Sequence, residues 1–323
     1  MRNVVRRRGL AAAAAVGLFV VLSFIPTPYY IVAPGSAVDL RARVVVEGYA
    51  PPSQPYYLTD VIIAPATATM LAARFLPGVR LVQRDAIAPA GISLQQYDRV
   101  LEDAMSSSQD IAAVVAERAA GFRVADPPEA IVIEDILPES KARGAFSVGD
   151  VLLSVNGRAL TASGQVAKAI RGLAPGSVVA AVVRRRGGVL NVRAATIATK
   201  NGTRFGIALS SRTLKPDLPV RVRFDVKNIS GSSGGLMFAL EIYGALRPGE
   251  RVGRTSIAGT GTLAFDGRVG PIEGTVQKLI AARRAGASVF FVPRENYRDI
   301  SGERGIKVVP VDTFRDALAA LRS

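Results

Sequence analysis

Apolar residues recur at the spacing of an α-helix in the first third of the chain. They fall at intervals of three and four residues between about 93 and 120, at Leu94, Tyr97, Val100, Leu101, Ala104, Ile111, Val114 and Val115. This spacing predicts an amphipathic helix whose apolar side faces a core. The rest of residues 27–118 consists of short β-like runs and proline-rich breaks, and it offers no catalytic constellation.

The middle of the chain, from about residue 121 to 200, changes to short strands and turns. A strand over residues 148–155 ends in Asn156-Gly157, and this dipeptide is a strong signal for a β-hairpin. The remaining expected elements are a strand at 131–133, a helix at about 161–173 and a closing hairpin of residues 178–184 and 189–193. We expect a small β-rich domain here.

The last part of the chain alternates between strands and helices. Residues 220–226 alternate between apolar and polar side chains with the period of a half-buried strand. The helices expected after it cover 234–246, 275–285 and 313–321, with strands at 256–265 and 288–292 between them. This order predicts an α/β domain.

The N-terminal segment has the pattern of a membrane anchor. Four arginines (Arg2, Arg6, Arg7 and Arg8) precede an uncharged stretch over residues 9–25. The stretch lies at the short end of the length that a transmembrane helix needs, and the positive-inside rule places its basic end in the cytoplasm. We therefore expect a single-pass cell-membrane protein with its bulk extracytoplasmic, in contact with the lipid bilayer. A cleaved signal peptide is the alternative, although no clear small-x-small cleavage site follows the stretch.

Composition excludes several kinds of site. The chain contains no histidine and no cysteine, so a Ser-His-Asp triad and a Cys-His pair are both impossible, and a zinc site is disfavoured. We expect no metal and no cofactor. The net charge is +15, but the basic residues are spread along the chain, and the densest cluster after the anchor, Arg184–Arg186, has no interleaved aromatic residues to stack on bases. We therefore expect no nucleic-acid partner.

One serine and one lysine remain as candidates for nucleophilic catalysis. Ser233 lies in a glycine-rich turn before an apolar helix, where backbone N–H groups could stabilise an oxyanion. Lys278 lies 45 residues downstream and could act as the base only if burial kept its amine neutral. Small residues share its side of the helix, which would allow close packing over the lysine but equally suits an ordinary solvated surface.

These residues fall in motifs that resemble the proteolytic domain of Lon-type serine proteases. Gly231-Ser232-Ser233-Gly234-Gly235 is similar to the nucleophile motif Gly-Pro-Ser-Ala-Gly of that family. Gly267-Arg268-Val269, Pro271-Ile272 and the run from Lys278 to Gly286 are similar to its lysine motif, and Thr260-Gly261 matches a Thr-Gly pair upstream. The resemblance covers residues 205–323. It implies Ser233 as nucleophile, Lys278 as base and Thr260 in a supporting role, with Gly231, Ser232 and Gly234 shaping the turn.

The chain also departs from that family in three positions. Ser232 replaces the proline and Gly234 the alanine, so a second hydroxyl stands beside the nucleophile. Glu273 replaces a glycine, and a carboxylate near Lys278 would favour the protonated amine. A catalytically inactive scaffold that only binds peptides is therefore the alternative to an active endopeptidase. Lon-type domains form rings, which leaves a homo-oligomer open, although the residues identify no interface.

The middle region resembles a PDZ domain. Pro138 with Ala142 and Gly144, the strand over 148–153, Asn156-Gly157 and Pro175-Gly176 carry this resemblance. PDZ domains bind extended peptides by strand addition. The nearest candidate for the loop that receives the peptide terminus is Gly121, Phe122, Arg123 and Val124.

Together these patterns predict a multidomain protein of mixed α+β and α/β class. The expected parts are a cytoplasmic tail (1–8), a transmembrane helix (9–25), an N-terminal extracytoplasmic region (27–118), a PDZ-like domain (119–200) and a Lon-type proteolytic domain (205–323). The resemblances imply a membrane-tethered serine endopeptidase that acts on unfolded or flexible polypeptides. No Gly-x-x-x-x-Gly-Lys-[Ser/Thr] sequence is present, so we expect it to work without ATP.

Overall fold

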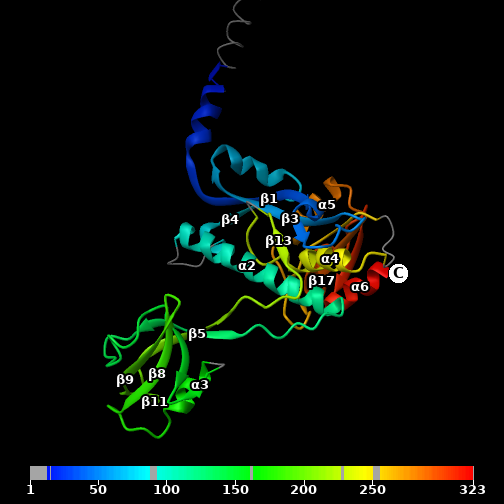
Figure 1. Ribbon diagram of the computed structural model, residues 1–323. Coiled ribbons are helices and arrows are strands. Elements are labelled where there is room, and N and C mark those ends of the chain that lie inside the picture. Colours follow the sequence, from blue (N-terminus) through cyan, green and yellow to red (C-terminus); the bar gives the residue numbers. More distant parts are fainter. Residues whose placement is uncertain are drawn as a thin grey trace, which may run out of the picture. The chain divides into compact units, whose positions relative to one another are not determined.

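The computed structural model describes residues 13–14, 16–87, 93–160, 163–226, 229–249 and 255–322. The chain is divided into two compact units (Figure 1). Unit 1 combines residues 1–124 with residues 218–323, and unit 2 consists of residues 125–217. Each is described separately.

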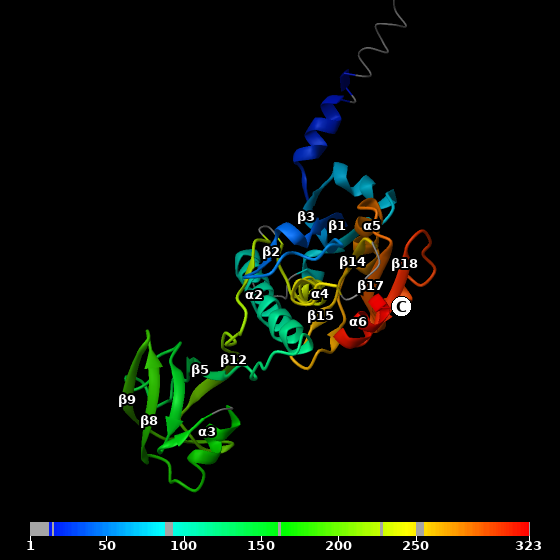
Figure 2. The ribbon, with the colours of Figure 1, turned by 45° about the vertical axis from the view of Figure 1, so that its right-hand side comes forward.

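Unit 1 is built around a six-stranded mixed sheet with the strand order β18-β17-β14-β3-β1-β4. The long strands β1 (Pro26–Asp39) and β3 (Tyr56–Thr67) pair antiparallel, and β4 (Arg80–Gln83) extends the sheet beside β1. On the other side β14 (Ile257–Gly259) pairs parallel with β3, followed by β17 (Val289–Pro293) and β18 (Lys307–Val311). Both ends of the chain therefore contribute to one sheet (Figure 2).

This sheet divides the chain differently from the expected ranges. Residues 27–118 form no domain of their own, because β1 pairs with β3 and β3 pairs in turn with β14, which lies some 200 residues downstream. Unit 2 begins near the expected residue 119 but continues to residue 217, because β12 (Ile207–Thr213) pairs along β5 (Glu129–Ile136) within the sheet of unit 2.

Helices cover both faces of the sheet in unit 1. Along β14 and β17, Ile257 and Phe291 point to the core that contains α4 (Gly235–Leu246), whereas Ala258 and Phe290 point to α5 (Thr275–Arg284). This is the alternation expected of strands that are buried on both faces. The core on the α4 side also contains residues of α2 (Leu94–Ala119) and α6 (Phe314–Arg322).

The sequence predicted these helices closely. A capping box at Ser93 and Gln96 begins α2, and α4, α5 and α6 begin and end within one residue of their expected bounds. The burial of α4 is more complete than its apolar stripe suggested, since every residue except Gly244 is buried. The long strand β1 was not predicted.

Unit 2 has a sheet with the order β12-β5-β6-β8-β9, with β7 paired to β6. The expected hairpin at Asn156-Gly157 joins β6 (Val151–Val155) to β7 (Arg158–Ala159), and both turn residues have positive φ. β8 (Val178–Arg185) and β9 (Gly188–Ala195) form the closing hairpin, and α3 (Gly164–Ala169) is shorter than the helix expected there. A core that includes Ile131, Leu152, Val183 and Phe205 fills the unit.

The other elements are short. They are η1 (Leu40–Ala42), β2 (Val44–Val46), η2 (Thr69–Phe75), η3 (Arg84–Ala86), β10 (Ile197–Thr199), β11 (Gly202–Arg204), β13 (Val222–Phe224), β15 (Thr262–Leu263), β16 (Val269–Gly270) and η4 (Arg294–Asp299). Of these, β13 pairs with β2, β10 with β11 and β15 with β16.

The N-terminal segment is helical over residues 13–14 and 16–24. The expected tail (1–8) and residues 9–12 and 15 of the expected transmembrane helix lie outside the described residues. Within the described part of the chain, no helix has the length and apolar character needed to cross a membrane.

Candidate active site

Ser233 and Lys278 meet at the end of strand β14. Ser233 lies in the turn directly before α4, and Lys278 lies in the first turns of α5 on the opposite face of the sheet. The lysine Nζ is 2.7 Å from the serine Oγ. The structure therefore brings together the two side chains that the sequence motifs indicated.

The neighbouring hydroxyl of Ser232 takes no part in this contact. Ser232 is exposed, and its backbone carbonyl accepts a hydrogen bond from the hydroxyl of Ser108 in α2 (3.0 Å). No hydrogen bond among the described residues involves the Ser232 side chain. The side chain of the extra serine thus makes no hydrogen bond to Ser233 or Lys278.

Close packing shapes the turn that carries Ser233. Gly231 has φ +89° and donates its N–H to the carbonyl of Leu101 in α2 (2.9 Å). A Cβ at Gly234 would lie 2.9 Å from Leu58 Cδ1. The glycine that replaces the alanine of the Lon-type motif therefore sits in a tightly packed place, where a side chain would have to displace its neighbours.

Thr260 connects the serine turn to the lysine. Its hydroxyl donates to the backbone carbonyl of Ser233 (3.1 Å) and is 3.1 Å from Lys278 Nζ, so it can also accept a hydrogen bond from the amine. The N–H of Gly261 donates to the same Ser233 carbonyl (2.8 Å). The Thr-Gly pair thus holds the serine backbone and the lysine amine in one geometry.

Burial lowers the pKa of Lys278. Lys278 is 4% exposed, and this burial lowers its pKa from 10.5 to about 8, because desolvation disfavours the charged ammonium. Asp60 and, to a smaller extent, Glu273 act in the opposite direction and raise the pKa. Glu273 is exposed, and its effect on the Lys278 pKa is smaller than that of burial.

Backbone donors are available next to the serine hydroxyl. No hydrogen bond within the described ranges uses the N–H of Ser232, Ser233 or Gly234. These groups lie at the N-terminus of α4, where the helix dipole also favours negative charge. They are suited to bind the oxyanion of a tetrahedral intermediate.

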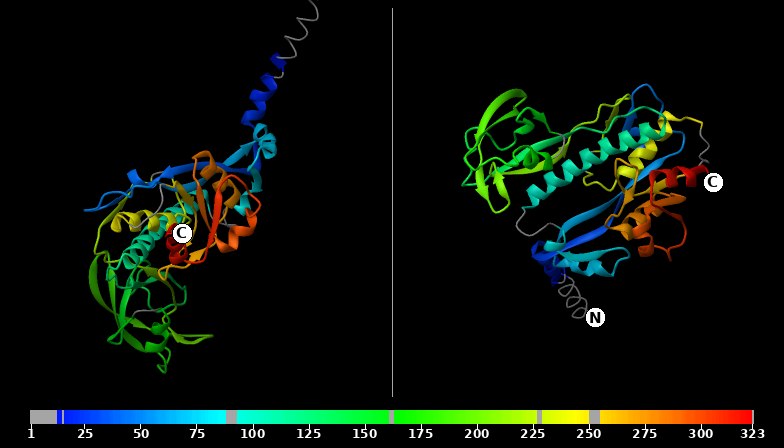
Figure 3. Two further views of the ribbon diagram at one scale, coloured as in Figure 1. Left: turned by 90° about the vertical axis from the view of Figure 1, so that its right-hand side faces the viewer. Right: turned by 90° about the horizontal axis from the view of Figure 1, so that it is seen from below.

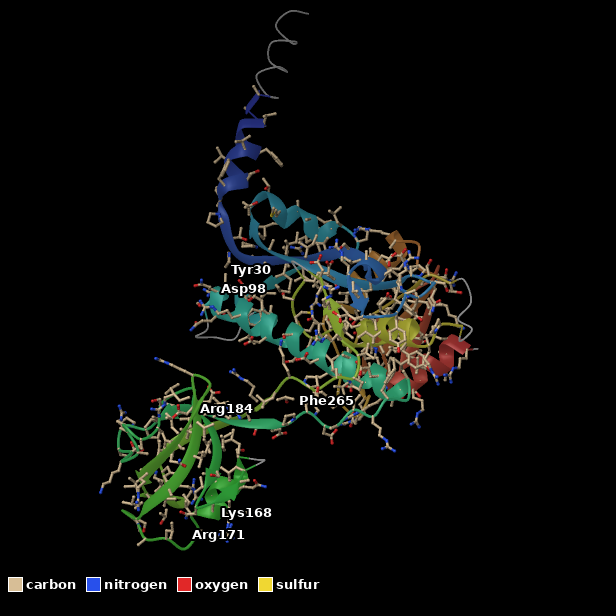
Figure 4. The ribbon with its side chains drawn as sticks, in the orientation of Figure 1. Tyr30, Asp98, Lys168, Arg171, Arg184 and Phe265 are labelled. Carbon is tan, nitrogen blue, oxygen red and sulfur yellow. The ribbon has the colours of Figure 1, made fainter. Side chains whose placement is uncertain are left out.

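A cavity of about 820 Å³ opens over the serine and the lysine. Its walls include the serine turn and residues 271–273, and also segments in which the sequence showed no functional residue. Strand β3 contributes Leu58 and Asp60, and the first half of α2 contributes Leu101 and Met105. Tyr30 of β1 and Asp98 of α2 lie at the same end of the unit and also line the cavity (Figure 4). The sequence signal for these walls was the apolar stripe of α2, which begins at Leu94, before the part of the helix that packs in the core.

The proposed peptide-binding loop Gly121, Phe122, Arg123 and Val124 was placed in the wrong unit. These residues belong to unit 1 and follow α2 directly. The N–H of Phe122 donates to Glu117 and that of Gly121, with φ +97°, to Arg118, which together form a Schellman motif. Gly121 therefore ends a helix, and Phe122 packs against the core of unit 1.

Unit 2 contains a different groove that could receive a peptide. A cavity of about 440 Å³ lies between α3 and the start of β12, and Arg204, Phe205 and Gly206 form its end. Among the described strands, β12 pairs only with β5, which leaves its other edge open. The signal in the sequence was the Phe205-Gly206 pair, which falls at the start of the range 205–323 expected for the proteolytic domain.

A metal site finds no support in the side chains. Within the residues that the structure describes, no group of three or more His, Cys, Asp or Glu side chains is arranged to hold a metal ion.

Comparison with known proteins assigns a class to the part of the chain that carries Ser233 and Lys278. Residues 215–320 match the Lon protease (S16) C-terminal proteolytic domain. The match begins where the chain returns from unit 2 to unit 1.

The curated relatives are named Lon protease. That of Azospirillum brasilense is 30% identical over 196 residues, which cover 58% of this chain and 22% of the relative. Lon protease 2 of Thermus thermophilus is 35% identical over 108 residues (33% of this chain, 13% of the relative), and Lon protease 2 of Bacillus subtilis is 33% identical over 93 residues (28% and 16%). The chain thus spans less than a quarter of the length of these relatives.

Two solved structures to which part of this chain is similar are PDZ domains. The PDZ domain of the SdrC-like protein from Listeria monocytogenes covers 27% of this chain and 93% of its own, with 17% sequence identity and a TM-score of 0.24. That from Listeria innocua gives the same values except for 98% coverage of its own chain. Similarity at this level carries no information about a ligand.

Proposed function

We propose that this protein is an ATP-independent serine endopeptidase in which Ser233 is the nucleophile and Lys278 the general base. The observation that carries the proposal is the 2.7 Å distance between Ser233 Oγ and the Nζ of a buried lysine whose pKa is lowered to about 8. A nucleophile within hydrogen-bond reach of its base, with a third group orienting the base, is the general arrangement of such sites. Thr260 is the third group.

The reaction follows from these contacts. As the Ser233 oxygen forms a bond to the peptide carbonyl carbon, its proton passes to the neutral amine of Lys278. The backbone N–H groups of the serine turn bind the resulting oxyanion. Lys278 then returns the proton to the leaving nitrogen as the C–N bond breaks. A water molecule then attacks the carbonyl carbon of the acyl-enzyme while Lys278 takes its proton. Lys278 returns that proton to the Ser233 oxygen as the ester C–O bond breaks, which regenerates Ser233.

The surroundings of the serine favour extended polypeptides as substrates. β14 pairs with β3 only at residues 56–58. Beyond Leu58 that edge of β3 turns towards the cavity and has no partner among the described strands. An extended segment can add to such an edge through backbone hydrogen bonds, which requires an unfolded or flexible substrate. A folded protein without flexible loops should therefore be cut slowly.

Unit 2 is proposed to bind peptides in the groove between α3 and β12. An open strand edge beside a helix is the geometry of peptide recognition by strand addition. In the alternative function, an inactive scaffold, this groove would be the only working site of the protein.

The membrane tether remains part of the proposal. Arg6, Arg7 and Arg8 precede the apolar residues 9–25, and the described helical part of that stretch exposes large apolar side chains, among them Phe19 (62%) and Phe24 (81%). Exposure of this kind is unfavourable in water and natural in lipid. Resistance to alkaline extraction from membranes, together with protease accessibility of unit 1 only from outside the cell, would test both the anchor and its orientation.

The catalytic proposal is tested with four forms of the full chain: wild type, Ser232→Ala, Ser233→Ala and Lys278→Ala. Turnover of an unfolded protein should persist in wild type and Ser232→Ala and disappear in the other two. Absence of turnover in all four, with peptide binding intact, would favour the scaffold. If Ser232→Ala lost activity and Ser233→Ala kept it, the nucleophile would be Ser232 and the proposal for Ser233 would be wrong.

A further inference from the structure

Two of the described large apolar side chains are more exposed than all others, and both lie at the junction between the N-terminal helix and unit 1. They are Phe75 (82%) and Phe24 (81%). Phe75 ends η2, the short helix between β3 and β4, and its neighbours Leu76 (59%) and Met70 (42%) are also exposed. A monomeric protein in water rarely exposes such a cluster without a partner.

Hydrogen bonds join η2 to the end of the N-terminal helix. The N–H of Ala68 donates to the carbonyl of Ile25 (3.0 Å), and the hydroxyl groups of Ser23 and Thr69 are 3.4 Å apart. The two segments lie side by side in both views of Figure 3. The exposed apolar surface of η2 is therefore continuous with that of the apolar helix.

The charged side chains of the segment around η2 are basic, and one of them, Arg80, also lines a cavity with Glu273 and Asp299 of other segments. From residue 61 to 84 the chain contains three arginines, Arg74, Arg80 and Arg84, and no acidic residue. All three are exposed, and the guanidinium of Arg74 lies over the ring of Phe75, 5.3 Å from its centre. Apolar side chains with arginines beside them are typical of segments that lie in the interface of an anionic membrane.

We propose that η2 is a second membrane contact, which docks unit 1 on the surface of an anionic bilayer. Met70, Phe75 and Leu76 enter the boundary between headgroups and acyl chains, and the three arginines lie at the level of the phosphates. This inference rests on the proposed tether, because the anchor would deliver η2 to the membrane. β3 lines the cavity from Leu58 to Pro65 and ends at Thr67, two residues before η2 begins, so docking would keep the cavity of Ser233 near the bilayer.

The absence of tryptophan from the chain allows a direct test. The full chain with Phe75→Trp is reconstituted in vesicles of phosphatidylcholine and phosphatidylglycerol that contain acyl chains brominated at defined depths. Docking predicts blue-shifted emission and strong quenching by the shallow bromines. Tyr49→Trp is the matched control: Tyr49 is an exposed aromatic residue (40%) of the turn that follows β2, and its replacement should not be quenched.

Charge provides the second arm. Arg74→Gln in the Phe75→Trp chain should lower the ratio of docked to undocked protein about fivefold, and Arg80→Gln by a similar factor, since each basic residue near such a surface contributes about 1 kcal/mol. Vesicles of phosphatidylcholine alone should weaken quenching in the same way.

Each outcome decides the question. If the chain floats with the vesicles but the Phe75→Trp indole is not quenched, the docking surface is refuted and the tether stands. If the chain does not float, both are refuted. A blue shift without quenching by bromine would show that protein, such as a second copy of the chain, covers η2 and would also overturn the proposal. None of these measurements depends on proteolytic activity.

Discussion

Replacing Lys278 by methionine should abolish turnover and yet stabilise the fold at neutral pH. Burial lowers the pKa of the lysine from 10.5 to about 8, which corresponds to about 3 kcal/mol in favour of the neutral amine. At pH 7 the amine is mostly protonated in both the folded and the unfolded chain, so the folded state bears this cost almost fully. Methionine fills a similar volume without a charge. In a Ser233→Ala background, loss of the hydrogen bond to Thr260 offsets part of the gain, which leaves on the order of 1–3 kcal/mol.

The pH dependence identifies the cause. Between pH 8 and 10.5 the unfolded chain binds more protons at this position than the folded chain, so the stability of the lysine form rises with pH. The advantage of Lys278→Met should therefore be fully present below pH 8 and should shrink as the pH rises through this window. We would measure urea unfolding of Ser233→Ala and Ser233→Ala/Lys278→Met at pH 7 and pH 10, in one detergent, so that self-cleavage does not interfere.

An exposed lysine of the same unit provides the control. Lys307 on β18 is exposed, and Lys307→Met should change the unfolding free energy by no more than about 0.5 kcal/mol at either pH. If Lys278→Met is less stable than its parent at pH 7, or if the difference between them is the same at pH 7 and pH 10, the lysine is not held in a desolvated state and the argument for an amine base fails.

Three further results are expected. The kcat/KM for an unfolded substrate should rise about tenfold per pH unit up to the Lys278 pKa near 8 and then level off. Asp60→Asn should move the midpoint of this profile to lower pH, because Asp60 raises the pKa of Lys278. A rate that falls across the same pH range would contradict an amine base. Thr260→Val should lower kcat about tenfold with little change in KM, and Thr260→Ser should keep kcat near the wild-type value. An unchanged kcat in Thr260→Val would show that the hydroxyl does not position the amine. Asp150→Asn should destabilise unit 2 by about 1–3 kcal/mol at pH 7 and by less in acid. Burial alone would raise the pKa of Asp150, but hydrogen bonds from Arg185 and a backbone N–H lower it, so the stabilisation by the carboxylate is lost as the pH falls through that lowered pKa. Urea unfolding followed by a probe in unit 2 would check this, with cleavage of a short peptide as the control for unit 1.

The local elements could be predicted well from the sequence. The helices around Ser233 and Lys278 have strong periodicity and clear end signals, and their observed bounds differ by only a residue. The strands of the first third are different. The partners of β3 include β14, about 200 residues away, and no local pattern specifies such a pairing. For this reason residues 27–118 were expected to be a separate region, although they complete the sheet of unit 1.

The groove of unit 2 that is proposed to bind peptides was missed for a related reason. The PDZ-like pattern was expected to end near residue 200, so the loop was sought at the N-terminal side, at Gly121. That glycine instead ends α2. β12 joins the sheet of unit 2 only through its pairing with β5, which begins about 80 residues earlier in the chain. The groove beside β12 therefore depends on a contact that the sequence does not display.

The proposed base depends on the same long-range assembly. The motifs indicated Ser233 and Lys278, but a lysine on a helix rich in small residues is equally compatible with a solvated surface. Its pKa is lowered because α5 packs against β1 and β3 of the distant N-terminal segment as well as against β14 and β17. The same β3 carries Asp60, which raises that pKa, so the first third of the chain contributes to the burial and also holds the strongest opposing charge. In this protein the residues that would perform the chemistry lie in the C-terminal segment, and the environment that would make the amine a base comes to a large extent from the N-terminal one.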